Sequence, residues 1–195
     1  MNEEKFYTRV ILASASPRRH EILTAAGLPH EIRPTDADET LPDGIAPAVA
    51  VEMLSARKAR AAWDGLLPGA VVIAADTVVA LDGRILGKPR GEADARKMLT
   101  ALSGREHEVY TGVTVGVPTH FVTAHERTLV RMRSLSPEEI EAYIRTGEPL
   151  DKAGAYGIQG RGGRFVSGIA GDYFNIVGLP LFCVSEILRR EFGIR

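Results

Sequence analysis

Residues 70–81 read AVVIAADTVVAL, and this stretch decides the fold. The residues on both sides of Asp76 are apolar and rich in β-branched side chains, which predicts buried strands at 71–75 and 77–81. Asp82-Gly83 then favours a hairpin turn into a strand at 84–86. A carboxylate in so apolar a run is costly unless it is paired, hydrogen-bonded or bound to metal. We therefore expect Asp76 at a strand end beside a cleft, the alternative being an aspartate that only caps a turn.

The segments around this stretch mix strands and helices without the strict alternation of a doubly wound fold. Strands are expected at 9–14, briefly within 29–45, and at 106–117, 121–133 and 164–169, and helices at 17–26, 47–64, 92–102, 136–146 and 181–192. The sequence therefore predicts one α/β domain over residues 1–195, with a mixed, elongated sheet and flanking helices.

Composition excludes several classes of function. The 24 basic and 25 acidic residues give a net charge of -1, which does not favour bulk attraction to nucleic acid or to an anionic membrane. No segment approaches the ~18 consecutive apolar residues of a membrane span, and the N-terminal sequence lacks an export pattern. Because Cys183 is the single cysteine, the chain is expected in a reducing compartment, the cytoplasm.

Two predicted helices begin with Ser-Pro and a charged pair, and helix stability explains only one of them. Ser136-Pro137-Glu138-Glu139 has a capping serine, a proline in the first helical position and a glutamate that closes a capping box. Ser16-Pro17-Arg18-Arg19 instead places two cations at the positive end of the helix dipole. A bound phosphate would reverse that unfavourable effect, so this pair predicts a phosphate site. The alternative is two arginines that extend into solvent.

Three further charged positions are candidates for the same site. Lys58 has small or apolar helical neighbours, so its ammonium is expected to point toward the cleft or, alternatively, to run along the helix to solvent. Lys88 follows a glycine but lacks the spacing and the hydroxyl residue of a P-loop, although it can contact phosphate as a point charge. Asp38-Glu39 supplies two carboxylates in a loop, where most acidic pairs are simply solvated.

Several segments together carry a resemblance to a known family. They are LASASPRRHEIL (12–23), Asp38-Glu39, ARKA (56–59), AADTVV (74–79), GKPR (87–90), LTALSGREHEVYTGV (99–113), EPLDKAGAYGIQGRGG (148–163) and GDYFNIVGLPL (171–181). In this order they resemble the motifs of the Maf family, also called septum formation proteins, over residues 11–188. Members are nucleoside triphosphate pyrophosphatases. The resemblance implies a fold related to inosine triphosphate pyrophosphatases, with two lobes around a cleft, and release of pyrophosphate from a nucleoside triphosphate.

The resemblance also implies roles for individual residues. Asp76 is the expected general base, acting on water directly or in the shell of a metal ion. Arg18, Thr77 and Gln159 match the positions linked to substrate choice, and the family's other active-site positions fall on Ser14, Arg19, Glu39, Lys58 and Lys88. The expected cofactor is Mg²⁺ or Mn²⁺, with Glu39 and Asp76 as its protein ligands.

The glycine-rich segment bears on the identity of the base. LDKAGAYGIQG (150–160) resembles the branch of the family that acts on dTTP and UTP. The Gln159 amide can pair with N3–H and a carbonyl of uracil or thymine, but the flipped amide can meet cytosine. Without the resemblance, GAYGIQGRGG (154–163) would be a flexible surface loop.

Two other functions stay open from the sequence. One is a pyrophosphatase for 7-methyl-GTP or for a broad set of modified nucleotides. The other is a nucleotide-binding regulator of cell division. Similarity suggests a homodimer as the oligomeric state.

Overall fold

The central apolar run forms one continuous strand, β3 (Ala70–Leu81), in a computed structural model that describes residues 7–66 and 68–194. The strands expected at 71–75 and 77–81 are therefore one, and the expected strand-end position of Asp76 is wrong. Asp76 pairs with Gly112 of β5 (Glu106–Val117), because a side-chain carboxylate leaves the backbone N–H and C=O available to the sheet. The predicted turn at Asp82-Gly83 is confirmed, since both residues have positive φ and lead into β4 (Arg84–Leu86).

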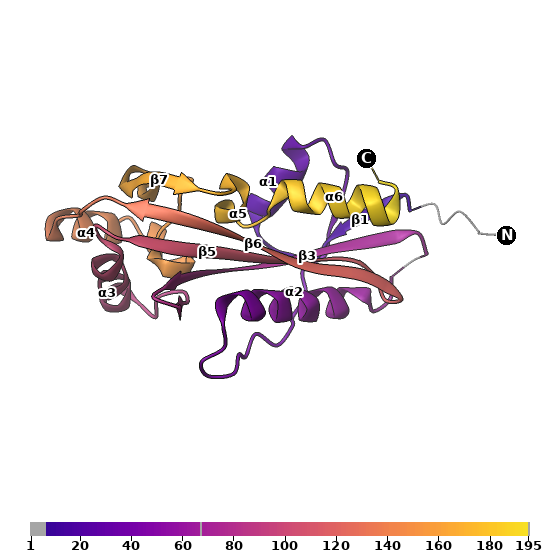
Figure 1. The fold of residues 1–195 in the computed structure, drawn as a ribbon, viewed down its shortest axis with the longest axis horizontal. Helices are drawn as coiled ribbons and strands as arrows, with labels where there is room; N and C mark the ends of the chain where they lie inside the picture. The colour runs from indigo at the N-terminus through magenta and orange to yellow at the C-terminus, as the bar shows by residue number, and fades with distance from the viewer. Residues whose placement is uncertain (1–6, 67, 195) are drawn as a thin grey trace.

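The described residues form a seven-stranded sheet in the order β2-β1-β3-β5-β6-β7, with β4 paired to β3. Strand β1 (Arg9–Leu12) runs parallel to β2 (Glu31–Ile32) and to β3. Strands β5, β6 (His120–Met132) and β7 (Val166–Ala170) continue the sheet in antiparallel fashion. The long strands give the molecule its elongated shape (Figure 1), and the prediction of a mixed, elongated sheet is confirmed.

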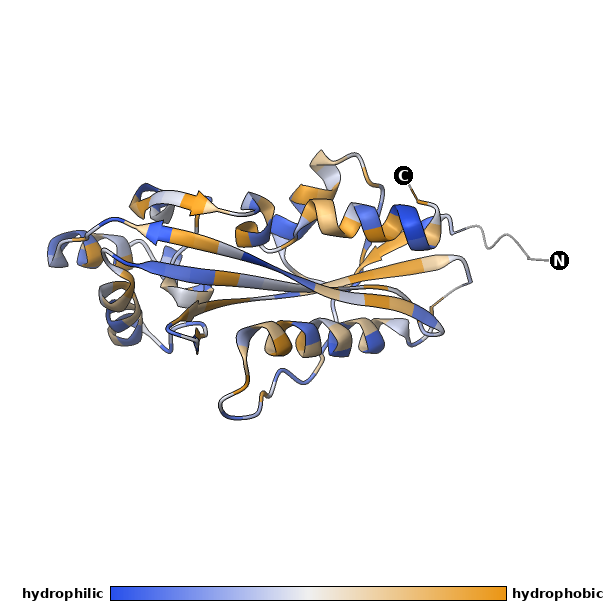
Figure 2. Ribbon diagram, viewed as in Figure 1, coloured by the Kyte–Doolittle hydropathy of each residue, from blue (hydrophilic) through white to orange (hydrophobic). Residues whose placement is uncertain are grey.

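Helices cover both faces of the sheet. Helix α2 (Pro47–Trp63) lies on one face, and α1 (Pro17–Ala25), α5 (Tyr173–Val177) and α6 (Leu181–Phe192) lie on the other (Figure 1). Alternate residues of β3 point to opposite faces, so Val71 and Ile73 pack in the core that includes α1 and α6, whereas Val72 and Ala74 pack with α2. Figure 2 shows this end of β1 and β3 as the most continuously hydrophobic part of the sheet.

A second core forms at the other end of the sheet, where α3 (Glu92–Leu102) and α4 (Pro137–Ile144) pack. On β3 this core begins at Val79, whereas the two cores described above, one on each face of the sheet, reach no further than Ala75. The three residues between them, Asp76 to Val78, therefore lie between two hydrophobic lobes. This arrangement confirms the expected two-lobed architecture.

One edge of β3 is open between the lobes. On the side away from β5, the strand pairs with β1 as far as Ile73 and with β4 only from Val79. The chain leaving β1 turns at residues 13–16 into helix α1, directly beside this gap. A gap where the sheet's strand order changes is a place at which α/β folds bind ligands.

The C-terminal third differs from the expectation in two places. The strand expected at 164–169 is wrong in its first two residues, because Arg161–Phe165 form a 3-10 helix and β7 runs over Val166–Ala170. A short helix, α5, was not expected, although Asp172 caps it by accepting a hydrogen bond from the Phe174 N–H at 2.8 Å. Within the described residues, no helix is long and apolar enough to cross a membrane.

Candidate active site

All nine predicted site residues line one cleft of about 760 Å³, which lies at the gap in the sheet. They come from the 13–19 turn and helix start, the 38–40 loop, α2, the middle of β3, the segment after β4 and the glycine-rich loop: Ser14, Arg18, Arg19, Glu39, Lys58, Asp76, Thr77, Lys88 and Gln159. The volume falls in the range of small-molecule sites. The structure thus brings these residues together, while their individual roles stay predictions.

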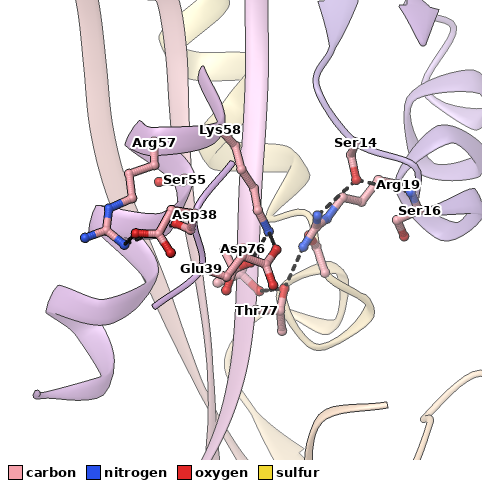
Figure 3. A network of polar contacts seen from close by, with 12 residues as sticks. Ser14, Ser16, Arg19, Asp38, Glu39, Ser55, Arg57, Lys58, Asp76 and Thr77 are labelled. Carbon is pink, nitrogen blue, oxygen red and sulfur yellow. Dashed lines mark hydrogen bonds and ion pairs between the residues drawn. The ribbon is translucent and has the colours of Figure 1, made fainter. Parts of the chain in front are cut away.

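Lys58 joins two carboxylates at the centre of the cleft (Figure 3). Its ammonium lies 2.5 Å from Asp76 Oδ1 and 2.7 Å from Glu39 Oε1. The Lys58 and Asp76 side chains are only 14% and 13% exposed, so the lysine does not run along the helix to solvent. The hydrogen bond from Lys58 lowers the pKa of Glu39 below its usual value. Glu39 is therefore held in its charged form, and both carboxylates lie close to one cation.

Two contacts of α2, one with the sheet and one with the 38–40 loop, place Lys58 and Glu39 at the centre of the cleft. Gly112 of β5 faces the helix so closely that a Cβ at that position would overlap the carbonyl oxygen of Val51. The helix can consequently lie directly on the sheet beneath Asp76. Arg57, next to Lys58, donates to the carbonyl oxygens of Asp38 and Thr40 at 3.1 and 2.7 Å, and these bonds hold the loop that carries Glu39. This role of Arg57 was not predicted from the sequence.

Arg19 is fixed on the opposite wall of the cleft (Figure 3). Its guanidinium donates to the carbonyl oxygen of Gly178 at 2.7 Å, to Ser14 Oγ at 3.1 Å and to Thr77 Oγ1 at 3.2 Å. The expectation that Arg19 extends into solvent is therefore excluded. Ser16 is the N-cap residue of α1, but its side chain makes no capping hydrogen bond; Ser14 Oγ accepts the Ser16 N–H at 3.2 Å. The capping box at Ser136 and Glu139 is confirmed.

The hydroxyl of Thr77 has a fixed direction. Thr111 Oγ1 donates its single proton to the carbonyl oxygen of Asn175, at 2.8 Å, and lies 2.9 Å from Thr77 Oγ1. Since the Thr111 proton is used, Thr77 must donate its own proton to Thr111 and accept from Arg19. Thr77 therefore has no free proton to donate into the cleft, and in this structure its hydroxyl oxygen orients Arg19. Thr111 is fully buried and was missed by the sequence analysis, since nothing local distinguishes it from other strand threonines.

Arg18 and Lys88 differ from the other cations of the cleft. Arg18 lies in the first turn of α1 and Lys88 follows β4. Both line the cleft, and within the described ranges neither side chain makes a hydrogen bond or ion pair with another residue. Their charges are thus available to an anion that enters the cleft.

The glycine-rich loop forms a wall of the cleft and is not a detached surface loop. Gln159 is exposed and lines the cleft together with Tyr156, Gly157 and Ile158. Tyr156 anchors the start of this wall, because its hydroxyl lies 2.7 Å from Nε2 of the buried His107. The loop motif could have suggested Tyr156 as an anchor, whereas its pairing with His107 depends on tertiary packing.

The carboxylates offer an oxygen-only donor set to a metal ion. Among residues 7–66 and 68–194, no group of three or more His, Cys, Asp or Glu side chains is arranged to hold a metal. Glu39 and Asp76 nevertheless converge on a shared cation, the Lys58 ammonium, within 2.7 Å. One or two carboxylates completed by phosphate oxygens and water suit Mg²⁺ or Mn²⁺. The residues present therefore fit the cofactor that the resemblance implies.

Comparison with known proteins gives the family. Residues 9–191 match the family model described as Maf-like protein. The chain belongs to the Maf family. A protein of Moorella thermoacetica named dTTP/UTP pyrophosphatase is 54% identical to this Maf protein over 189 residues, 96% of each chain. Proteins with the same name from Symbiobacterium thermophilum and from a strain of Bacillus cereus are each 49% identical, covering 95% of this chain and 94% and 96% of theirs.

A solved structure, the Ham1 protein of Staphylococcus aureus, aligns with this Maf protein at a TM-score of 0.47 and 16% identity. The alignment covers 64% of this chain and 72% of that chain.

Proposed function

We propose that this Maf protein is a nucleoside triphosphate pyrophosphatase that hydrolyses dTTP and UTP to the monophosphate and pyrophosphate. The observation that carries the proposal is the opposition, in one cleft, of a carboxylate pair held by Lys58 and a set of placed cations. The names of relatives 49–54% identical over nearly the whole chain support the same activity and the same bases.

Asp76 is the residue best placed to activate water. Lys58 occupies Oδ1 at 2.5 Å, and no described residue donates to Oδ2, which leaves that oxygen to accept a proton from a water molecule. The ammonium also fixes the orientation of the carboxylate, because the lysine comes from a helix packed against the same strand. The water then attacks the α-phosphorus and pyrophosphate leaves.

Cations supply most of the binding of the triphosphate in this proposal. Arg19 is held by three hydrogen bonds and cannot swing away, while Arg18 and Lys88 have no competing partner among the described residues. Ser14 and the backbone N–H groups at the start of α1 add donors at the positive end of a helix. Such fixed charges stabilise the charge that develops on the phosphate oxygens without reorganising during the reaction.

Glu39 and Asp76 would hold Mg²⁺ or Mn²⁺ when the metal is bound with the nucleotide. The ion would supply neutralisation of phosphate charge and alignment of the triphosphate. In the same cleft, the Gln159 amide offers both a donor and an acceptor to the N3–H and carbonyl edge of uracil or thymine.

The proposal is tested by pyrophosphate release from dTTP, UTP, CTP, GTP, ATP and 7-methyl-GTP, with Mg²⁺ or Mn²⁺ and without metal. We expect selective, metal-dependent turnover of dTTP and UTP. Asp76→Asn should abolish turnover while nucleotide binding, followed by calorimetry, is retained. Asp82→Asn is the matched control, because Asp82 is an exposed carboxylate of the same hairpin outside the cleft.

Each of the other functions predicts a different result in that experiment. Preference for 7-methyl-GTP, or turnover of all six nucleotides, would keep the chemistry and contradict the assignment of Gln159. Nucleotide binding without turnover by the wild type would favour a regulator.

We also propose a cytoplasmic location and a homodimer. Light scattering on the purified chain tests the oligomeric state.

A further inference from the structure

Glu148 contacts the loop that carries Gln159 without lining the cleft itself. It is the first residue of the 3-10 helix Glu148–Asp151, and it is not among the described residues that form the cleft wall. Its Oε2 accepts the Arg161 N–H at 3.0 Å, and its Oε1 accepts the Gly162 N–H at 3.1 Å. The two donors lie two and three residues after Gln159 in the chain, so this carboxylate fixes the C-terminal side of the loop.

Tyr143 of α4 completes the contact on the N-terminal side. Its hydroxyl donates to Glu148 Oε1 at 2.9 Å and accepts the Gly157 N–H at 3.3 Å. The ring is 3% exposed and packs edge-on against Phe165. Glu148 and Tyr143 together therefore hold the backbone two residues before Gln159 and two and three residues after it.

The glycines of GIQGRGG fit this pair closely. A Cβ at Gly160 would lie 2.7 Å from Glu148 Oε1, and a Cβ at Gly162 would lie 2.6 Å from the Tyr143 hydroxyl oxygen. Real side chains essentially never approach so closely. Gly160 and Gly162 thus leave room for one carboxylate and one hydroxyl beside the loop.

The charge of Glu148 strengthens these hydrogen bonds. Burial alone would raise its pKa, but the N–H groups of Gly162 and Arg161 and the Tyr143 hydroxyl outweigh burial and lower the pKa. The carboxylate is consequently ionised at neutral pH and accepts charge-assisted hydrogen bonds, which are stronger than those between neutral groups.

We infer that Glu148, acting with Tyr143, is a positioning residue for base selection: it holds residues 157–162 so that the Gln159 amide faces the base. The inference rests on the proposed pyrophosphatase activity. It assigns selectivity to a residue outside the cleft, because an amide can distinguish one base edge from another only while the backbone that carries it is fixed.

The first test compares steady-state kinetics of wild type and Glu148→Gln on dTTP and CTP. The glutamine replaces one acceptor oxygen by an NH₂ that cannot accept, so at least one backbone N–H loses its partner. We expect KM for dTTP to rise about tenfold and the dTTP/CTP ratio of kcat/KM to fall about tenfold, with kcat within about threefold. Glu139→Gln is the matched control, because Glu139 is a carboxylate of the same lobe that caps α4 and does not contact the loop.

A double-mutant cycle separates positioning from general weakening of the fold. If Glu148 acts through Gln159, then Glu148→Gln should change the dTTP/CTP ratio less than about twofold in a Gln159→Ala background. An equal effect in both backgrounds, or unchanged selectivity in the single variant, would overturn the inference. Should Glu148→Gln not fold, Tyr143→Phe removes the hydrogen bond between Tyr143 and Glu148 and retains the buried ring.

Hydrogen exchange distinguishes failure of this inference from failure of the proposed activity. The amides of Gly157, Arg161 and Gly162 should exchange about tenfold faster in Glu148→Gln than in the wild type, while the α4 amides are unchanged. If the wild type turns over no nucleotide, the proposed activity is wrong and exchange alone decides the positioning role. Exchange at 157–162 that is identical in the two proteins would contradict that role whatever the activity.

Discussion

Lys58 of α2 and Asp76 of β3 form a 2.5 Å ion pair between the helix and the strand that meet at the centre of the cleft. The two residues are 18 positions apart, and each is nearly enclosed by the packing of α2 on the sheet. Glu39 reaches the same ammonium from the 38–40 loop. The geometry of the Asp76 carboxylate therefore depends on how closely one helix lies on the sheet.

Removal of the shared cation should impair the reaction more than folding. Lys58→Met leaves Asp76 and Glu39 adjacent without a counter-charge, and we expect kcat for dTTP to fall about 100-fold or more, as for loss of a fixed transition-state donor. The pKa of Glu39 should rise, since the hydrogen bond that lowers it is gone; a ¹³C NMR titration of the carboxyl carbon measures this. Arg60→Met, an exposed change on the same helix, should alter neither quantity. Full activity of Lys58→Met would refute the assigned role.

Arg19 is hydrogen-bonded to Thr77, and Thr77 to Thr111. This chain of hydrogen bonds predicts an effect of substitution at Thr111, which does not line the cleft. Thr111→Val removes the buried acceptor of the Thr77 hydroxyl and one of the two donors to the Asn175 carbonyl oxygen, which still accepts the Gly178 N–H at 3.1 Å, and should lower the free energy of unfolding by about 1–3 kcal/mol. KM for dTTP should also rise, because Thr77 no longer holds Arg19 in one orientation. Urea denaturation and steady-state kinetics measure the two effects. Thr111→Ser keeps the hydroxyl and should restore both the stability and KM. If Thr111→Ser is as impaired as Thr111→Val, the hydrogen bonds through Thr77 and Thr111 do not orient Arg19.

Gly112 is the position that lets α2 approach the sheet. Gly112→Ala places a methyl group on the Val51 carbonyl oxygen, and we expect a loss of about 1–3 kcal/mol in the free energy of unfolding from overpacking. Turnover should fall as well, since displacement of the helix moves Lys58 from Asp76. The control is Gly168→Ala, where no atom lies within 4 Å of the added carbon and thermal unfolding should be unchanged. Equal stability of the two variants would mean that the close approach does not matter.

His107 makes the stability of the protein depend on pH. Burial lowers the pKa of this histidine from 6.5 to about 4. The unfolded chain therefore binds a proton below pH 6.5, whereas the folded chain does so only near pH 4. The free energy of unfolding should consequently fall as pH drops through this window, by up to about 3 kcal/mol.

Urea denaturation at pH 6.5 and pH 5 checks this dependence. His107→Gln cannot titrate there and should lose less stability than the wild type between the two conditions. His120→Gln removes a half-exposed histidine and should behave as the wild type does. If wild type and His107→Gln lose the same stability on acidification, another group is responsible.

Local sequence determined much of the fold, because periodicity, capping and turn chemistry act over a few residues. The apolar run at 70–81 made a strand, Asp82-Gly83 made its turn, and Ser136 with Glu139 capped a helix. The same local rules failed where a residue's surroundings were set from a distance. Asp76 did not end the strand, because sheet pairing with β5 continued through it, and Ser16 did not cap α1 through its side chain.

The composition of the candidate site could also be predicted, while its internal contacts could not. An unusual arginine pair, a carboxylate in an apolar run and a lysine on a small-residue face each indicated an anion site, and family resemblance joined them. Only the tertiary structure paired Lys58 with Asp76, fixed Arg19 against Gly178 some 159 residues away, and set the direction of the Thr77 hydroxyl. Hydrogen-bond partners depend on strand register and helix packing, which bring together residues whose local sequences carry no information about each other.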